Sequence, residues 1–196
     1  GIVSLRITGR RLDRLDARPG QFFLWRFLDR KRWWAAHPFS LSEAPDGRSL
    51  RITVKALGDF SSRLAEIAPG TRVVAEGPFG VFTAAARRRE KIVLIAGGIG
   101  ITPIRALMED MSGDVIVIYR VVRDEDVIFR DELEELAGGT TMEDAQQQVL
   151  AQPLVAPVAG IADPVGEKNE QVLSLNPAQR RGLRDFIEHP QRGIDR

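Results

Sequence analysis

The chain has 196 residues, enough for one large domain or two small ones, and 43% of them are hydrophobic, enough for a real core. The net charge of +1 gives no support for a nucleic-acid partner. The lack of Cys, with only His37 and His189 far apart in sequence, predicts no disulfide, no metal site and no cysteine nucleophile, and the lack of a long apolar run or signal peptide predicts a cytoplasmic chain.

Short strand-like segments separated by turns predict an all-β unit over residues 1–86, an antiparallel sheet or barrel. The expected strands lie at 1–8, 21–28, 50–56 and 71–76. Gly77–Gly80 is expected to form a turn between domains, and Ser61 or Ser62 is expected to cap a short helix that runs to about Ile67. Arg87, Arg88 and Arg89 are expected to form a solvated linker.

The adjacent Trp33 and Trp34 follow a charged turn in this unit. We expect one of these rings to lie over an end of the barrel. The alternatives are exposure on a lip, or packing against a membrane or a partner.

From Lys91 the pattern changes to strand, helix and strand. Ile92–Ile95 is a short apolar run of the kind that a parallel strand covered on both faces shows, and Val115–Tyr119 is a second such run. The segment between them predicts a helix, so the three elements form a βαβ unit with a parallel strand pair.

A glycine turn joins the first of these strands to the helix. Gly97, Gly98 and Gly100 allow a sharp turn and close approach of a ligand to the backbone. Thr102 is expected to cap the helix, and Pro103 suits its first turn. Free N–H groups at such a helix start favour a phosphate or pyrophosphate. The alternative is a glycine turn that only packs a helix on a sheet.

The rest of the chain is less regular. Asp126–Leu136 predicts an amphipathic helix, residues 138–172 are expected to be irregular, and Leu175–Glu188 predicts a helix capped by Asn176 with Pro177 at its first position. Arg120 and Arg123 stand at the carboxyl end of the second parallel strand, where a doubly wound sheet contacts the ribose end of a nucleotide.

Four motifs occur in order: HPFSLS from His37, GDFSS from Gly58, GPFG from Gly77 and GGIGITP from Gly97. In this order the chain resembles the ferredoxin–NADP reductase superfamily, and most closely the flavin- and nicotinamide-binding half of ferric reductases and NADPH oxidases. The resemblance covers residues 1–136 and, more weakly, 173–188. It implies an antiparallel flavin-binding β-barrel at 1–86, followed by a doubly wound parallel-sheet NAD(P)-binding domain at 90–196.

The resemblance assigns FAD to the first domain. Phe39 would stack on the isoalloxazine, and Ser40 would hydrogen-bond near its reactive nitrogen, which makes Ser40 a catalytic candidate. His37 stands where the family usually has the Arg that meets the pyrophosphate. The remaining residues implied to bind FAD are Pro38, Val54, Lys55, Gly58, Ser61 and Ser62.

The resemblance assigns NAD(P)H to the second domain. Gly97, Gly98, Gly100 and Pro103 would form the turn that holds the pyrophosphate, with Thr102 as a second catalytic candidate near the nicotinamide. Arg120 and Arg123 would favour the 2′-phosphate of NADPH, because a guanidinium forks well onto phosphate.

The sequence also departs from the family. The later Cys-Gly-Pro motif, the last strand and the C-terminal aromatic residue that covers the flavin are absent, and the barrel is expected to start at its second strand. We therefore expect either a fragment or a variant with an incomplete nucleotide domain, in which a missing central strand would expose apolar surface and an open sheet edge.

The resemblance implies an FAD-dependent NAD(P)H oxidoreductase that passes electrons singly to ferric iron, haem or a carrier protein. A haem-bearing membrane domain upstream would place the chain at the cytoplasmic face of a membrane. One alternative is a soluble reductase, with FMN as its candidate flavin, that serves an oxygenase or ferredoxin, although the helix cap at Ser61 and Ser62 argues for FAD. Another is a flavin- or nucleotide-binding module without turnover.

Overall fold

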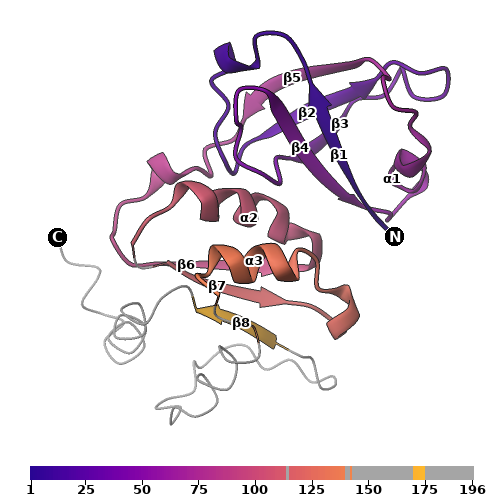
Figure 1. Cartoon of the computed structure of the whole chain (residues 1–196). Coiled ribbons are helices and arrows are strands. Elements are labelled where there is room, and N and C mark those ends of the chain that lie inside the picture. The colour runs from indigo at the N-terminus through magenta and orange to yellow at the C-terminus, as the bar shows by residue number, and fades with distance from the viewer. Residues whose placement is uncertain (114, 140–141, 143–169, 175–196) are drawn as a thin grey trace. The chain divides into compact units, whose positions relative to one another are not determined.

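The computed structural model describes residues 1–113, 115–139, 142 and 170–174 (Figure 1). The chain divides into two compact units. Unit 1 comprises Gly1–Arg88 together with Ile99–Met111, and unit 2 comprises Arg89–Gly98 together with Ser112–Arg196. The units therefore divide the chain differently from the expected domains 1–86 and 90–196, because one helix that follows the glycine turn groups with the β-rich unit.

Unit 1 is built from five antiparallel strands. These are β1 (Ile2–Thr8), β2 (Phe22–Phe27), β3 (His37–Ser40), β4 (Ser49–Lys55) and β5 (Val73–Phe79). They form a two-stranded sheet, β1-β4, and a three-stranded sheet, β3-β2-β5. The predicted antiparallel β unit is confirmed, although the described strand pairs do not close into a continuous ring.

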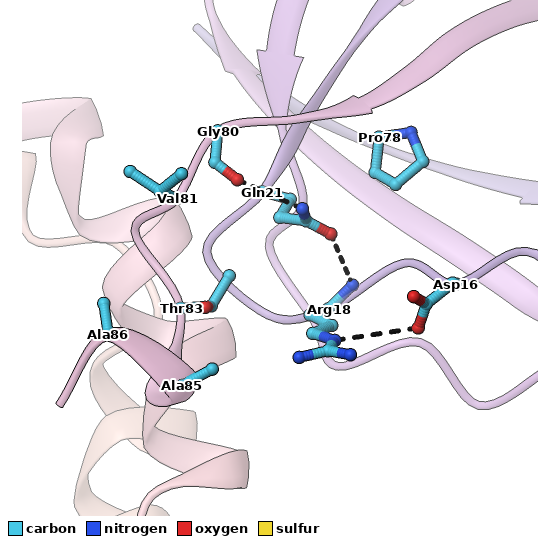
Figure 2. A pocket seen from close by; sticks show the side chains of 9 residues that line it. All are labelled: Asp16, Arg18, Gln21, Pro78, Gly80, Val81, Thr83, Ala85 and Ala86. Carbon is cyan, nitrogen blue, oxygen red and sulfur yellow. Dashed lines mark hydrogen bonds and ion pairs between the residues drawn. The ribbon is translucent and has the colours of Figure 1, made fainter.

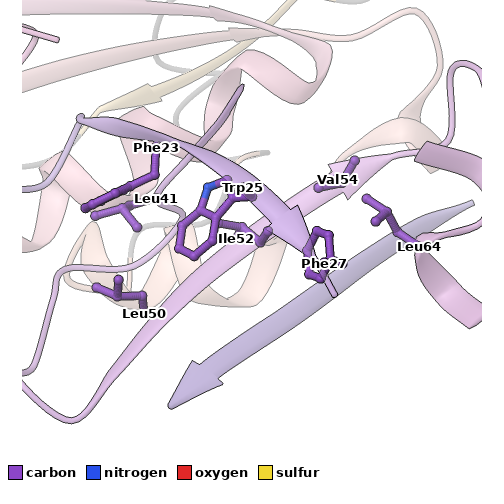
Figure 3. Packing of buried hydrophobic residues seen from close by; sticks show 8 residues of the cluster. All are labelled: Phe23, Trp25, Phe27, Leu41, Leu50, Ile52, Val54 and Leu64. Carbon is purple, nitrogen blue, oxygen red and sulfur yellow. The ribbon is translucent and has the colours of Figure 1, made fainter. Parts of the chain in front are cut away.

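The core of unit 1 lies between these sheets (Figure 3). Strand β2 alternates, so Phe23, Trp25 and Phe27 point inward and are almost fully buried. Burial of each such ring contributes roughly 1.5–3 kcal/mol of stability. The rings meet aliphatic side chains from β4 and its neighbouring segments, namely Leu41, Leu50, Ile52, Val54 and Leu64.

Two predictions for unit 1 are wrong. Gly77–Phe79 continues β5 and does not form a turn, since Phe79 pairs with Phe22 across the sheet and a cis peptide bond joins Gly77 to Pro78. A Cβ at Gly77 would lie 2.7 Å from the Phe23 ring, so close packing on the core requires glycine there. Neither Trp33 nor Trp34 covers an end of the sheets, because their exposed fractions are 59% and 62%.

The helix α2 (Ile101–Asp110) belongs to unit 1. The buried Arg105 donates to the Ser42 carbonyl at 3.2 Å, and the backbone N–H of Ala44 donates to Glu109 at 2.8 Å. Arg105 and Glu109 also form an ion pair. These polar contacts join α2 to the segment between β3 and β4.

Unit 2 contains a mixed sheet in the order β6-β7-β8. Strands β6 (Ile92–Gly97) and β7 (Val115–Arg120) are parallel, as predicted, whereas β8 (Glu170–Ser174) is antiparallel to β7. Strand β8 was not predicted, and its first three residues fall in the range expected to be irregular. It pairs by backbone hydrogen bonds, which its weak apolar pattern did not reveal.

Two further expectations for unit 2 need correction. Strand β6 was expected to be covered on both faces, but Ile95 is 72% exposed while Leu94 and Ala96 are buried, so the described residues cover one face. The helix expected from Asp126 is α3 (Arg130–Leu136), preceded by a 3-10 turn at Asp124–Asp126. Phe129 has a left-handed φ of 61°, which breaks the helical path before Arg130.

The predicted helix at Leu175–Glu188, with Asn176 and Pro177, lies outside the described residues, as does most of 138–172. Of the helices in the described part of the chain, none combines the length and the apolar character that crossing a membrane requires.

Candidate functional site

The predicted flavin segment His37–Ser40 is strand β3, at the edge of the three-stranded sheet. It pairs with β2, so that Phe39 lies opposite Phe23 and Ser40 opposite Phe22. The buried Trp25 fixes β3 further, because its indole Nε1 donates to the Phe39 carbonyl at 3.0 Å. The Ser40 hydroxyl is half-buried and forms no hydrogen bond with any residue that the structure describes.

Three aromatic rings lie nearly parallel beside β3. The imidazole of His37 stacks on Phe60 with a centroid distance of 3.6 Å and an interplanar angle of 22°. The Phe39 ring lies 6.4 Å from each of them, at 18° to His37 and 19° to Phe60. Phe60 was not predicted as a site residue, although the aromatic position within GDFSS was a signal for it. The predicted residues Phe39 and His37 are therefore parts of one aromatic cluster.

Phe60 comes from the short helix α1 (Asp59–Ser62). The N-cap of α1 is Gly58, in an extended conformation, and not Ser61 or Ser62 as predicted. The Ser61 hydroxyl instead accepts from the N–H groups of Leu57 at 2.9 Å and Gly58 at 3.0 Å, and donates to the Gly58 carbonyl at 3.1 Å. It closes the turn before the helix, while Ser62 is exposed.

The end of β4 completes this region. Val54 is 4% exposed and its side chain packs in the core, whereas Lys55 is half-buried at the strand end. Helix α1 contacts β4, and β3 contacts β4, so the predicted flavin segments meet in one place.

The residues in this place fit FAD chemically. A flat ring system needs an aromatic face, which Phe39 offers, and one small hydroxyl, which Ser40 offers. A diphosphate needs N–H donors and positive charge, and the first N–H groups of α1 have no partner within the helix. Lys55 supplies a cation on the adjoining strand.

Two cavities of unit 1 lie away from these residues. One has a volume of about 570 Å³ and is lined by residues that include Arg18, Gln21 and Thr83 (Figure 2). Gln21 accepts from the Arg18 backbone and donates to the Gly80 carbonyl there. The other has a volume of about 610 Å³ and lies between β1 and the segment 67–73, beside the end of β2. Neither of these two cavities is lined by a predicted flavin residue.

The glycine turn leaves open space around its backbone. A Cβ placed on Gly97, Gly98 or Gly100 would meet no described atom within 4 Å. Packing therefore does not require glycine at these positions, which weakens the alternative that the turn serves only to pack a helix. Gly98 has a φ of 50°, which favours glycine for a backbone reason. The turn fits a diphosphate that approaches the backbone closely.

Thr102 is placed differently from the prediction. The N-cap of α2 is Gly100, and the Thr102 hydroxyl donates to the Ile99 carbonyl at 3.0 Å. Thr102 is 5% exposed, so this hydrogen bond to the Ile99 carbonyl stabilises the turn from its buried side. Pro103 is the third residue of α2, in its first turn as predicted.

Arg120 ends β7 and is paired in register with Gly97, so the parallel ladder brings this cation level with the glycine turn. Arg123 is held by acids: it lies 2.9 Å from Glu125 and 3.2 Å from Asp126. The hydrogen bond that Arg123 donates to the Asp126 carboxylate is the main cause of a raised Arg123 pKa. A 2′-phosphate would have to compete with these two carboxylates for Arg123.

Comparison with known protein families supports both halves of the assignment. Residues 3–83 match a family model described as an FAD-binding domain, and residues 94–159 match one described as an oxidoreductase NAD-binding domain. The two matched cofactors, FAD and NAD(P)H, are those that the sequence predicted.

Two individual relatives support the same assignment of FAD- and NAD(P)-binding parts. Ferredoxin–NADP reductase B of Sorangium cellulosum is 32% identical over 110 residues, which cover 52% of this chain and 45% of that protein. Dual oxidase 2 of Rattus norvegicus is 34% identical over 84 residues, covering 38% of this chain and 6% of that protein. The chain thus spans less than half the length of these relatives.

Among solved structures, the FAD/NAD-binding domain of nitric oxide dioxygenase from Vibrio cholerae is similar. It superposes with a TM-score of 0.58 at 25% identity, covering 70% of this chain and 63% of that one. The β-rich part followed by an α/β part is therefore a shared arrangement of elements.

Proposed function

Because the chain belongs to the ferredoxin–NADP reductase superfamily, we propose that it is an FAD-dependent NAD(P)H oxidoreductase that delivers electrons to a one-electron acceptor. One NAD(P)H would give up a hydride and two acceptors would each gain one electron, with release of a proton. A bound flavin supplies the conversion from two-electron to one-electron transfer. The observation that carries the proposal is the parallel aromatic cluster of His37, Phe39 and Phe60 beside the start of α1.

In this proposal FAD is held by residues of unit 1. Phe39 offers a flat face for the isoalloxazine, and the Ser40 hydroxyl orients it by a hydrogen bond. The N–H groups of α1 and the Lys55 ammonium balance the diphosphate charge. Ser61 acts indirectly, since its hydroxyl holds the turn at Gly58 that presents those N–H groups.

The glycine turn would hold the nicotinamide coenzyme. Gly97, Gly98 and Gly100 leave the backbone accessible to its diphosphate, with Pro103 in the helix turn that follows. Thr102 contributes as a positioning residue, because its buried hydroxyl fixes the Ile99 carbonyl. Arg120, level with Gly97, is the candidate contact to the ribose end, with Arg123 as a weaker candidate while its two acids remain in place.

The acceptor is proposed to be ferric iron, a haem or a small redox protein. The similarity to a ferredoxin–NADP reductase supports a carrier protein, and the similarity to dual oxidases supports the haem of a membrane domain. The second case would place the chain at the cytoplasmic face of a membrane.

Anaerobic spectroscopy tests the proposal. The purified chain is titrated with FAD, separated from free flavin, and mixed with NADPH or NADH without oxygen. We expect a bound flavin whose visible bands disappear on addition of coenzyme, and return when ferricyanide is added as a one-electron acceptor. Ser40→Ala should slow the loss of the bands without releasing FAD, while Ser112→Ala, at an exposed serine outside the predicted cofactor sites, should match the wild type.

The alternative, a binding module without turnover, predicts another result. The exposed Ile95 on β6 favours it, because an uncovered apolar face is a sign of a nucleotide unit that needs further cover. FAD bands that form but persist with either coenzyme would support this alternative and contradict the oxidoreductase. A chain that binds no FAD would contradict both.

A further inference from the structure

Two tryptophans are exposed in the loop that joins β2 to β3. Trp33 and Trp34 have exposed fractions of 59% and 62%, whereas the third tryptophan of the chain, Trp25, is fully buried. Their rings pack edge to face, with centroids 6.3 Å apart and an angle of 89°. Adjacent large apolar rings on a surface commonly mark a contact site. We call residues 29–36 the Trp loop.

A buried arginine anchors the Trp loop. Arg32 is 4% exposed, pairs with Asp29, and donates to the Arg63 carbonyl at 2.6 Å. Glu66 lies 3.5 Å from the same guanidinium. The Lys31 backbone N–H also donates to Asp29, at 2.9 Å. The loop is therefore tied to the segment after α1, and this anchor holds the two rings outward.

The surface around the Trp loop is basic. Two acids there are already engaged, since Asp29 pairs with Arg32, and Glu66 lies 3.4 Å from Lys31. The Arg72 carbonyl accepts from the Leu28 N–H at 2.8 Å, which places Arg72 at the base of the loop. The exposed basic residues in and beside the loop are Arg30, Lys31, Arg63 and Arg72. A chain with a net charge of only +1 thus concentrates positive charge beside its two exposed tryptophans.

We propose that the Trp loop docks unit 1 on the surface of an anionic phospholipid membrane. Indole rings prefer the boundary between headgroups and acyl chains, where their apolar body and N–H are both satisfied. Neighbouring Lys and Arg side chains are attracted to anionic headgroups. The loop is too short to insert deeply, so the docking is peripheral. His37 begins β3 directly after the loop, so docking holds the aromatic cluster close to the membrane surface.

A single-stranded nucleic acid fits the same surface less well. Stacked bases need open ring faces arranged along a strand. The edge-to-face packing of Trp33 and Trp34 turns the edge of one ring toward the face of the other, which leaves no pair of parallel faces. The proposal uses no cofactor and is independent of the proposed oxidoreductase activity.

Vesicle sedimentation tests whether the Trp loop docks on a membrane. The full chain is spun with vesicles of phosphatidylcholine alone, or of phosphatidylcholine mixed with phosphatidylglycerol. We expect binding to the mixed vesicles that weakens as salt rises. Trp33→Ser/Trp34→Ser should lower the affinity by roughly tenfold or more. Arg30→Gln/Lys31→Gln should lower it by about fivefold for each cation removed.

The control is a second pair of adjacent exposed apolar residues in unit 1, Val81 and Phe82, with exposed fractions of 85% and 49%. Val81→Ser/Phe82→Ser should bind vesicles like the wild type. Equal losses in both double variants, or no vesicle binding by the wild type, overturn the proposal, and the second result would leave a protein partner as the occupant of this surface.

Tryptophan fluorescence gives an independent measurement. Emission from the wild type should shift to shorter wavelength on addition of mixed vesicles, because two of its three tryptophans leave water. Trp33→Phe/Trp34→Phe keeps only the buried Trp25, so its emission should be unaffected by vesicles and should also show that unit 1 is folded. A shift of equal size in that variant contradicts docking through the loop.

Discussion

The imidazole of His37 stacks on the ring of Phe60, with centroids 3.6 Å apart, and so joins the start of β3 to helix α1. These two segments lie in different motifs of the sequence, yet both are predicted to hold flavin. Their contact joins the two parts of the candidate site through protein side chains. A site whose parts are held together by the protein loses less conformational entropy on binding, and this favours affinity.

Removal of the Phe60 ring should weaken FAD binding. Phe60→Ala loses a stacked aromatic pair, worth about 0.5–1.5 kcal/mol, so we expect the Kd for FAD to rise by about two- to tenfold. The Kd for FAD is measured from the quenching of FAD fluorescence on binding. Phe82→Ala, which removes another partly exposed ring of unit 1, should leave the Kd unchanged. If Phe60→Ala lowers only the unfolding free energy, the ring has a structural role alone.

The two serines of GDFSS should behave differently. The Ser61 hydroxyl satisfies two backbone N–H groups before α1, so Ser61→Ala should cost about 1 kcal/mol of stability and weaken FAD binding through a looser turn. Ser62→Ala removes an exposed hydroxyl and should change neither quantity. Urea unfolding and FAD titration of the pair measure both effects, and equal behaviour of the two variants would rule out the turn-holding role.

The variants Gly98→Ala and Gly100→Ala distinguish the effect of backbone strain on stability from the effect of an added methyl group on coenzyme binding. Both positions have room for a methyl group, but Gly98 has a φ of 50° and Gly100 a φ of −61°. We expect Gly98→Ala to cost about 1 kcal/mol in thermal unfolding, and Gly100→Ala to cost little. Both should raise the KM for NAD(P)H if a diphosphate approaches this backbone. An unchanged KM in the stable variant Gly100→Ala would contradict a coenzyme site at the turn.

Local pattern was enough to predict most elements of the fold. The strand at 21–28 was predicted from its apolar and aromatic residues, and Phe23, Trp25 and Phe27 of β2 face the core, while the strand at 50–56 was predicted from alternation. The parallel β6-β7 pair follows from two apolar runs on either side of a helix. The residues of β3 and α1 were assigned to flavin through the family resemblance of the motifs HPFSLS and GDFSS.

Contacts between distant segments were not predictable in this way. Phe60 joins the site only because the chain returns α1 to β3, and β8 forms only because its backbone pairs with β7. Side-chain directions were not predictable either: Val54 lies on the core face of β4, and Thr102 turns back to the Ile99 carbonyl. Such directions depend on register and on local hydrogen bonds, which residue type alone does not determine.

Tyr119 offers a direct report on unit 2, because it is the only tyrosine of the chain and is fully buried. Burial is the main cause of its raised pKa. Since the folded state favours the neutral phenol, its contribution to stability is complete below the ordinary pKa of about 10 and is lost as the pH rises through the folded pKa. Near-ultraviolet absorbance should show tyrosinate forming at higher pH in the folded chain than in denaturant, and coincident curves would contradict burial.

The carboxylates beside Arg123 should weaken any preference of the chain for NADPH over NADH. Asp126→Asn removes the carboxylate that hydrogen-bonds Arg123 at 3.2 Å, so the guanidinium becomes more available to a 2′-phosphate. We expect the ratio of kcat/KM for NADPH to that for NADH to rise by about fivefold. Asp131→Asn, the same charge change in the first turn of α3, is the control and should alter the ratio little. If Asp126→Asn leaves the ratio unchanged while Arg120→Ala lowers it, then Arg120, level with the glycine turn, is the arginine that contacts the phosphate.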